Sequence, residues 1–173
     1  MAEKFSSFDQ MGKAMGHSKP KDEKRGAGQR GKQNFQENLK EPDFLKLDYD
    51  YVGHAEKVMR QMQNPNKYGK MSFGSLTTSK IRNILTLVNE IYNKVIISSE
   101  EKLDERIMNE IRYMKVRLVY ESGREKAVAG FAQKSDIITA IDFIGDDRAK
   151  LIRYSRYLEA LVAYFKFLGG NEQ

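Results

Sequence analysis

Apolar residues recur at intervals of three and four from about residue 50 onward, the spacing that places them on one face of an α-helix. The first segment of this kind covers residues 50–63 and follows Asp48 or Asp50, either of which can cap it. A second segment begins after Thr77 or Thr78, which have the same capping chemistry. Both segments are predicted to be amphipathic helices, and the Gly- and Asn-rich stretch between them is predicted to be a loop.

A third helix is predicted to be long. Ser98 followed by Glu101 fits a capping box, and further acidic residues cluster just after it, where a helix N-terminus favours negative charge. The apolar spacing continues to about Ser122, and Gly123 can end the helix. We therefore expect one long helix from Ser98 to about Ser122.

Three further helices are predicted toward the C-terminus. Two are short, over residues 127–133 and 136–144, and Ser135 can cap the second of them. The last begins after Asp146 or Asp147 and carries apolar positions down to a pair of glycines. The chain also lacks any long alternation of apolar and polar residues, and it has no internal repeat. The pattern predicts an all-α fold, a compact bundle of about five or six helices over residues 47–173.

The segment before this bundle has a different composition. Residues 12–35 contain seven basic and two acidic residues and few apolar ones, so residues 1–46 are predicted to form a basic, disordered N-terminal tail. Two interpretations remain open for it, a solubilising tail and an RNA-contacting arm that orders on binding. Because no signal peptide or membrane span is evident, we expect the protein to be cytoplasmic.

The chemistry that the residue types allow is narrow. The chain has no cysteine and only two histidines, so Cys- or His-based metal centres and thiolate nucleophiles are not expected. Phosphate-binding loops and nucleophile elbows are also missing from the sequence. We predict a binding protein without cofactor or metal; the rival enzyme hypothesis is a small magnesium-dependent nuclease that would use Glu100, Asp104 or Asp146.

Net charge favours a polyanionic or acidic partner. Thirty Lys and Arg residues against 24 Asp and Glu residues give a formal charge of +6 and a pI near 9.3. Basic residues gather on the second, third and last predicted helices. Because three helices contribute them, they are expected to form a shared basic surface and not one local charged segment. The candidate RNA-contacting residues are Lys80, Arg82, Lys115, Arg117, Arg124, Lys126, Arg153 and Arg156.

Aromatic residues accompany these cations along the third and last helices. Stacking on unpaired bases is one possible role, but aromatic residues at helical spacing more often belong to the core, and this interpretation is favoured. The residues concerned are Tyr113, Tyr120, Tyr154, Tyr157, Tyr164 and Phe167. No signature of a sequence-specific RNA-binding module occurs, so contact with the nucleic-acid backbone is expected.

Four segments resemble one known family in their order and spacing. They lie at residues 51–58, 76–83, 115–124 and 156–164, and the similarity extends over about residues 50–169. This pattern is similar to the small helical subunit of type III-A CRISPR effector (Csm) complexes.

The resemblance implies a non-enzymatic subunit, present in several copies, that lines the inner side of a ribonucleoprotein filament in antiviral defence. It implies guide RNA and target RNA as partners, together with the backbone subunits and the large signalling subunit. On the matching segments it carries over all the candidate residues above except Lys126. The alternative is a basic protein-interaction module that bridges acidic partner subunits and does not contact RNA.

Overall fold

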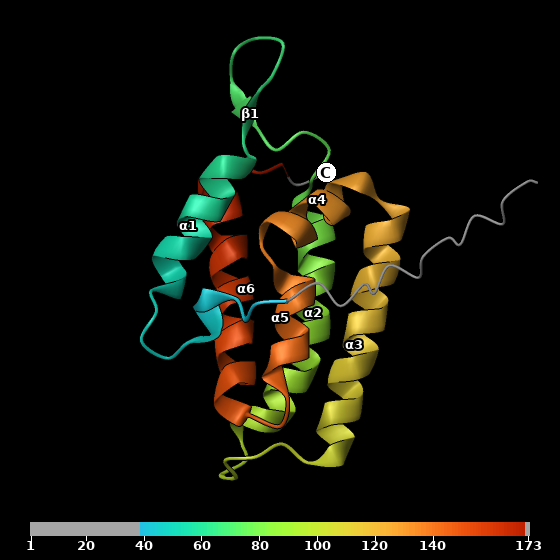
Figure 1. Ribbon diagram of the computed structural model, residues 1–173. Helices are drawn as coiled ribbons and strands as arrows, with labels where there is room; N and C mark the ends of the chain where they lie inside the picture. The colour runs from blue at the N-terminus through green and yellow to red at the C-terminus, as the bar shows by residue number, and fades with distance from the viewer. Residues whose placement is uncertain (1–38, 172–173) are drawn as a thin grey trace, which may run out of the picture. The chain divides into compact units, whose positions relative to one another are not determined.

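The computed structural model describes residues 39–171, and these form a bundle of six α-helices (Figure 1). The predicted all-α fold is confirmed. A short 3-10 turn, η1, precedes the helices, and a small hairpin of two strands, β1 and β2, interrupts them. In chain order the elements are η1 (Asp43–Leu45), α1 (Tyr51–Met62), β1 (Asn64–Pro65), β2 (Met71–Ser72), α2 (Thr78–Ile96), α3 (Glu105–Arg124), α4 (Lys126–Lys134), α5 (Ile137–Ile144) and α6 (Arg148–Phe167).

Side-chain caps fix where four of these helices begin. Asp50 accepts hydrogen bonds from two backbone amides of α1, and Thr77 and Asp147 cap α2 and α6 in the same way. The predicted start of α3 is wrong. Asp104 caps this helix by accepting from the amide of Ile107 at 2.7 Å, six residues beyond the predicted cap at Ser98. Helix α3 also continues through the predicted end to Arg124.

The junction between α4 and α5 differs from its prediction. Ser135 does not cap α5, because its hydroxyl is buried and donates back to the carbonyl of Phe131 at 2.6 Å. Asp136 follows with a φ of 52°, a left-handed conformation that non-glycine residues rarely adopt. Buried tyrosines of α6 hold this turn: the Tyr157 hydroxyl donates to the Ser135 carbonyl and the Tyr154 hydroxyl to that of Ile137, at 3.2 and 3.1 Å.

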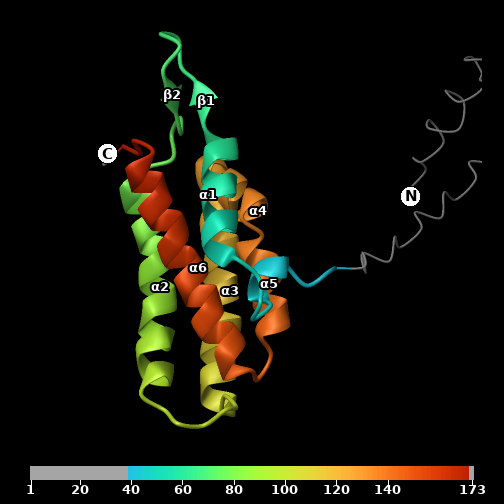
Figure 2. The same cartoon turned by 90° about the vertical axis from the view of Figure 1, so that its left-hand side faces the viewer.

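Helix α6 is the centre of the core. It packs against α1 and α2 along its length and against α5, while α3 packs against α2, α4 and α5. Figure 1 shows α1 and α3 at opposite sides of the bundle, and Figure 2 shows α6 running beside α2. Its buried face contains the two largest fully buried side chains, Tyr154 and Tyr157, together with Leu151, Leu158, Leu161 and Phe165.

Contacts between distant parts of the chain tie both ends of the described range to the helices. Phe44 and Leu45 of η1 are buried, and the Phe44 ring stacks on that of Tyr157 at 3.8 Å between centroids. These two residues lie upstream of the predicted domain start at residue 47. Near the C-terminal limit of the described range, the amide and hydroxyl of Thr78 both donate to the carbonyl of Asn171, at 2.8 and 2.7 Å. In the described range, no helix is both long and apolar enough to span a membrane.

The segment predicted as a loop between α1 and α2 contains the hairpin. Asn64 pairs with Ser72 and Pro65 with Met71, so each strand is only two residues long and gives no alternating pattern to detect. The Asn66 side chain accepts from two amides of the connecting turn, and Gly69 there has a φ of 75°. The hairpin projects beyond the helices in Figure 2, and its side chains are mostly exposed.

Candidate nucleic-acid interface

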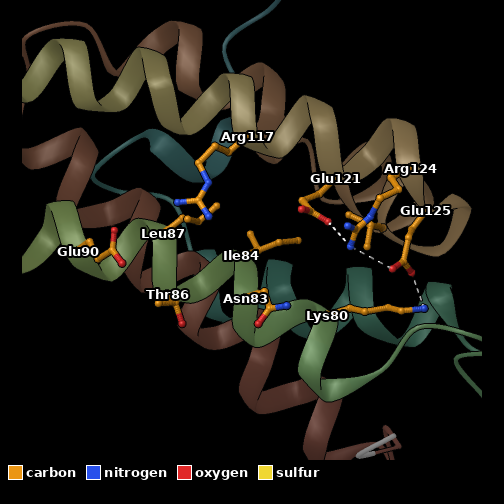
Figure 3. A pocket seen from close by; sticks show the side chains of 11 residues that line it. Lys80, Asn83, Ile84, Thr86, Leu87, Glu90, Arg117, Glu121, Arg124 and Glu125 are labelled. Atoms are coloured by element: carbon orange, nitrogen blue, oxygen red, sulfur yellow. Dashed lines mark ion pairs between the residues drawn. The ribbon is translucent and has the colours of Figure 1, made fainter.

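A cleft of about 230 Å³ lies between α2 and α3 and extends to the start of α4. Ion pairs fix the antiparallel register of the two helices, because Lys94 contacts Glu110 toward one end at 2.7 Å and Lys80 contacts Glu125 toward the other at 2.5 Å. This register brings together three of the predicted cations. Lys80 comes from α2, and Arg117 and Arg124 come from α3 (Figure 3).

Carboxylates in the same cleft neutralise part of this positive charge. Glu125 forms an ion pair with Lys80, and the Arg124 guanidinium lies 3.2 Å from the Glu121 carboxylate and 3.8 Å from that of Glu125 (Figure 3). Glu90 also lines the cleft, so that three acidic residues face three basic ones. The site is therefore charge-balanced in the free protein, which the excess of basic residues in the sequence did not predict.

Arg117 is the exception among the three cleft cations. Its side chain reaches from α3 toward Leu87 of α2 (Figure 3), and it has no ion pair within the described part of the chain. Ile84, Leu87 and Val128 supply the apolar part of the lining. An incoming phosphate would thus find one unpaired guanidinium, with two further cations that it can share with Glu121 and Glu125.

Three other predicted residues lie outside this cleft. Arg82 on α2 and Lys126 at the first position of α4 are exposed and do not line it. Lys115 is paired with Asp142 of α5, with 2.6 Å to the Oδ2 atom, so this pair links α3 to α5. The structure therefore gathers Lys80, Arg117 and Arg124 but leaves Lys115 in a separate pair.

The last two predicted residues border a second hollow of about 360 Å³, next to α6 and the loop after η1. Arg153 is committed to the fold. Its Nε donates to the Phe44 carbonyl at 2.8 Å and its Nη2 to the Tyr49 carbonyl, and its guanidinium lies over the Tyr51 ring at 5.2 Å. Arg156, one turn further along the helix, is exposed.

Two of the three acidic residues considered for a nuclease have structural partners, and the third, Glu100, is exposed. Asp104 caps α3, and Asp146 forms an ion pair with Lys102 at 2.8 Å. Lys102 holds the pKa of the Asp146 carboxyl below its usual range. No group of three or more His, Asp or Glu residues able to hold a metal ion occurs among residues 39–171.

The aromatic residues separate into two sets. The core interpretation is confirmed for Tyr154 and Tyr157, and Tyr164 is half-buried against the core. It is wrong for Tyr113, Tyr120 and Phe167, which are 64%, 63% and 78% exposed. The sequence contained a usable signal for this difference. Tyr113 and Tyr120 are seven residues apart, and each is out of phase with the buried face of Ile111, Met114 and Leu118 on the same helix.

Comparisons with known proteins converge on one family. The family model for Csm2 Type III-A matches residues 53–171. A Streptococcus thermophilus protein named CRISPR system Cms protein Csm2 is 42% identical over 125 residues, which cover 72% of this chain and 96% of that protein. Proteins of the same name from Enterococcus italicus and Mycobacterium tuberculosis are 41% and 35% identical, over 65% and 72% of this chain and 82% and 95% of their own lengths.

Proposed function

The chain belongs to the Csm2 family of type III-A CRISPR systems, and from this premise we propose that it binds RNA as a non-catalytic small subunit of the effector complex. Its RNA partners would be the guide and the target. Its protein partners would be further copies of itself, the backbone subunits and the large signalling subunit. The family resemblance predicted from the sequence is confirmed; the RNA contact and the role in lining the filament belong to the proposal.

One observation carries the RNA contact. Lys80, Arg117 and Arg124 come from two helices and line one cleft, where a single strand could bring its phosphates to more than one of them. Arg117 is already free to bind a phosphate. Arg82 on α2 and Lys126 on α4 are exposed outside the cleft, and they would extend the basic surface. Such contacts address the backbone and give no sequence specificity.

Charge balance in the cleft also favours a second candidate function. Because Glu90, Glu121 and Glu125 match the three cations, the cleft could equally receive a polypeptide segment that carries both charges. In that case the protein would bridge partner subunits without touching RNA. Crosslinking of the assembled particle separates the two, since RNA adducts on α2 and α3 support the first function and adducts confined to protein support the second.

A triple variant tests the RNA proposal directly. Lys80→Gln, Arg117→Gln and Arg124→Gln together should weaken binding of single-stranded RNA and make the log–log salt dependence shallower by about 2, at about 0.7 per lost phosphate contact. A matched control removes three exposed cations elsewhere, Lys46, Arg60 and Arg106, by the same substitution. Equal losses in both variants would show that only net charge matters, and unchanged binding in the cleft variant would refute the proposal.

A further inference from the structure

The outward face of α3 carries a row of apolar side chains that nothing in the bundle covers. Tyr113, Val116 and Tyr120 are 64%, 62% and 63% exposed. Their spacing of three and four residues places them on one side of the helix, away from the face buried against α2, α4 and α5. We call these three residues the tyrosine face. Large side chains grouped in this way on a surface commonly mark a binding site.

Basic residues predominate along the tyrosine face. From Ile111 to Tyr120 the sequence contains three basic residues and no acidic residue. Of these, Lys115 is paired with Asp142, whereas Arg117 has no ion pair in the described range, and Arg112 is held by Glu105 in an exposed pair at 2.8 Å. Exposed pairs of this kind are weak and exchange readily for another anion. Charge complementarity therefore favours a polyanion as the occupant.

Position along the helix connects the tyrosine face to the cleft. Tyr113 and Tyr120 are separated by seven residues, which corresponds to about 10 Å along the axis with an angular offset of about 20°. Arg117 lies between them in the sequence and reaches into the cleft (Figure 3). Arg124, also a cleft residue, has its guanidinium carbon 6.0 Å from the centroid of the Tyr120 ring. The same two arginines thus border both surfaces.

We propose that Tyr113 and Tyr120 stack on unpaired bases of a single-stranded RNA whose phosphates bind the cleft cations. This inference rests on the proposed function and adds a second mode of contact to it. Every base has a flat aromatic face, so stacking adds affinity without reading the sequence. It also requires bases that are not already paired, and it therefore makes the protein prefer single-stranded RNA over a duplex with the same backbone charge.

The test compares two double variants of the full chain. Tyr113→Ala with Tyr120→Ala removes both rings, and Tyr113→Phe with Tyr120→Phe keeps the rings and removes only the hydroxyls. Binding is measured to three probes: a single-stranded oligouridylate, an RNA duplex of the same length, and heparin, a polyanion without bases. Tyr68→Ala serves as the matched control, because Tyr68 is 79% exposed and lies in the turn between β1 and β2, outside α3.

We expect the alanine variant to bind oligouridylate at least about 25-fold more weakly, from a loss of about fivefold or more for each of the two stacked bases. Heparin and duplex binding should change by less than about twofold, and the phenylalanine variant should bind like the wild type. Tyr68→Ala should have no effect on any probe. Thermal unfolding of each variant confirms that the bundle is intact.

Several results would overturn the inference. Equal losses for oligouridylate and heparin would assign the effect to charge or folding, and failure of the phenylalanine variant would assign it to the hydroxyls. If the wild type binds RNA through the cleft cations and the alanine variant does so equally well, only the stacking inference fails. If that variant instead loses a partner subunit, the tyrosine face is a protein interface. If the wild type does not bind RNA at all, the proposed function fails with it.

Discussion

Arg153 on α6 and Arg117 on α3 are the same type of residue with the same predicted role, yet their surroundings differ completely. Arg153 meets the carbonyls of Phe44 and Tyr49, which lie at the 3-10 turn and the loop before α1. Arg117 meets an open cleft. The role of a basic residue is therefore decided by the groups that its side chain meets in the folded protein, and these groups come from distant parts of the sequence.

Arg153 makes these contacts because the backbone carbonyls of a segment outside the helices need hydrogen-bond donors. Carbonyls outside a helix have no donor four residues further on, and a buried carbonyl left without one costs free energy. A guanidinium has several N–H groups in a fixed fork and can serve two such carbonyls at once. The η1 segment, called the anchor below, is held to α6 in this way, with Phe44 packed on Tyr157.

The largest effect expected from this comparison is on stability. Arg153→Ala should lower the free energy of unfolding by about 2–4 kcal/mol, because it removes charged hydrogen bonds to two carbonyls and uncovers the anchor. Arg156→Ala, one turn away and exposed, should change it by less than about 0.5 kcal/mol. Urea unfolding followed by circular dichroism measures both. Equal effects would mean that Arg153 does not hold the anchor.

A smaller loss of stability should follow from the buried hydroxyls of α6. Tyr154→Phe and Tyr157→Phe should each cost about 1 kcal/mol, since each leaves a carbonyl of the α4–α5 junction without its donor. Burial raises the pKa of both phenols well above the usual value, so neither ionises in the physiological range. The exposed Tyr68→Phe is the control in the same unfolding assay, and a loss there of equal size would contradict the assignment.

In the cleft, the expected effect is a gain of affinity. Glu125→Gln should raise the affinity for single-stranded RNA about two- to fivefold, because it frees Lys80 and Arg124 from a competing carboxylate. Glu110→Gln is the matched control, since it removes the same charge from a pair between the same two helices. A filter-binding series with both variants, repeated on a Lys80→Gln background, gives the coupling between the two groups. An equal gain from Glu110→Gln would show a general charge effect.

The smallest expected effect is on the pH dependence of stability, and it concerns His54, whose ring centroid lies 6.1 Å from that of Phe44 in the anchor. His54 is half-buried, and its Nδ1 lies 3.1 Å from the Tyr49 hydroxyl. Burial lowers its pKa below the usual value of about 6.5, with nearby Asp136 opposing this and Lys57 adding to it. The unfolded chain then binds this proton more readily, so stability is fully present above pH 6.5 and declines as the pH falls below it.

His54→Asn should flatten this decline between pH 7.5 and 5.5, as measured by thermal unfolding at each pH. Asp136 acts in the opposite sense at lower pH. Burial raises the pKa of its carboxyl, so the folded state takes up that proton first and gains stability as the carboxyl is neutralised. If the slope of stability against pH is unchanged by His54→Asn, titration of His54 does not cause the decline.

The sequence predicted those features that depend on neighbours along the chain. The registers of α1, α2 and α6 followed from apolar spacing, and Asp50 and Thr77 cap where capping chemistry indicated. The start of α3 was predicted wrongly at Ser98, because Asp104 has the same capping chemistry and caps the helix in the folded chain. The contacts of Lys80 with Glu125 and of Arg153 with Phe44 join residues 45 and 109 positions apart, and no local pattern contains them.

The central place of α6 has a consequence for how the protein is made on the ribosome. The apolar faces of α1 and α2 are covered mainly by α6, and Gln63 and Thr78 bond to the carbonyls of Leu168 and Asn171. About 70 residues separate the end of α2 from the end of α6. During translation, the apolar faces of α1 and α2 therefore stay exposed until α6 has left the ribosome. The bundle can close only after synthesis of its final helix, and a nascent chain released early would expose the surfaces most prone to aggregate.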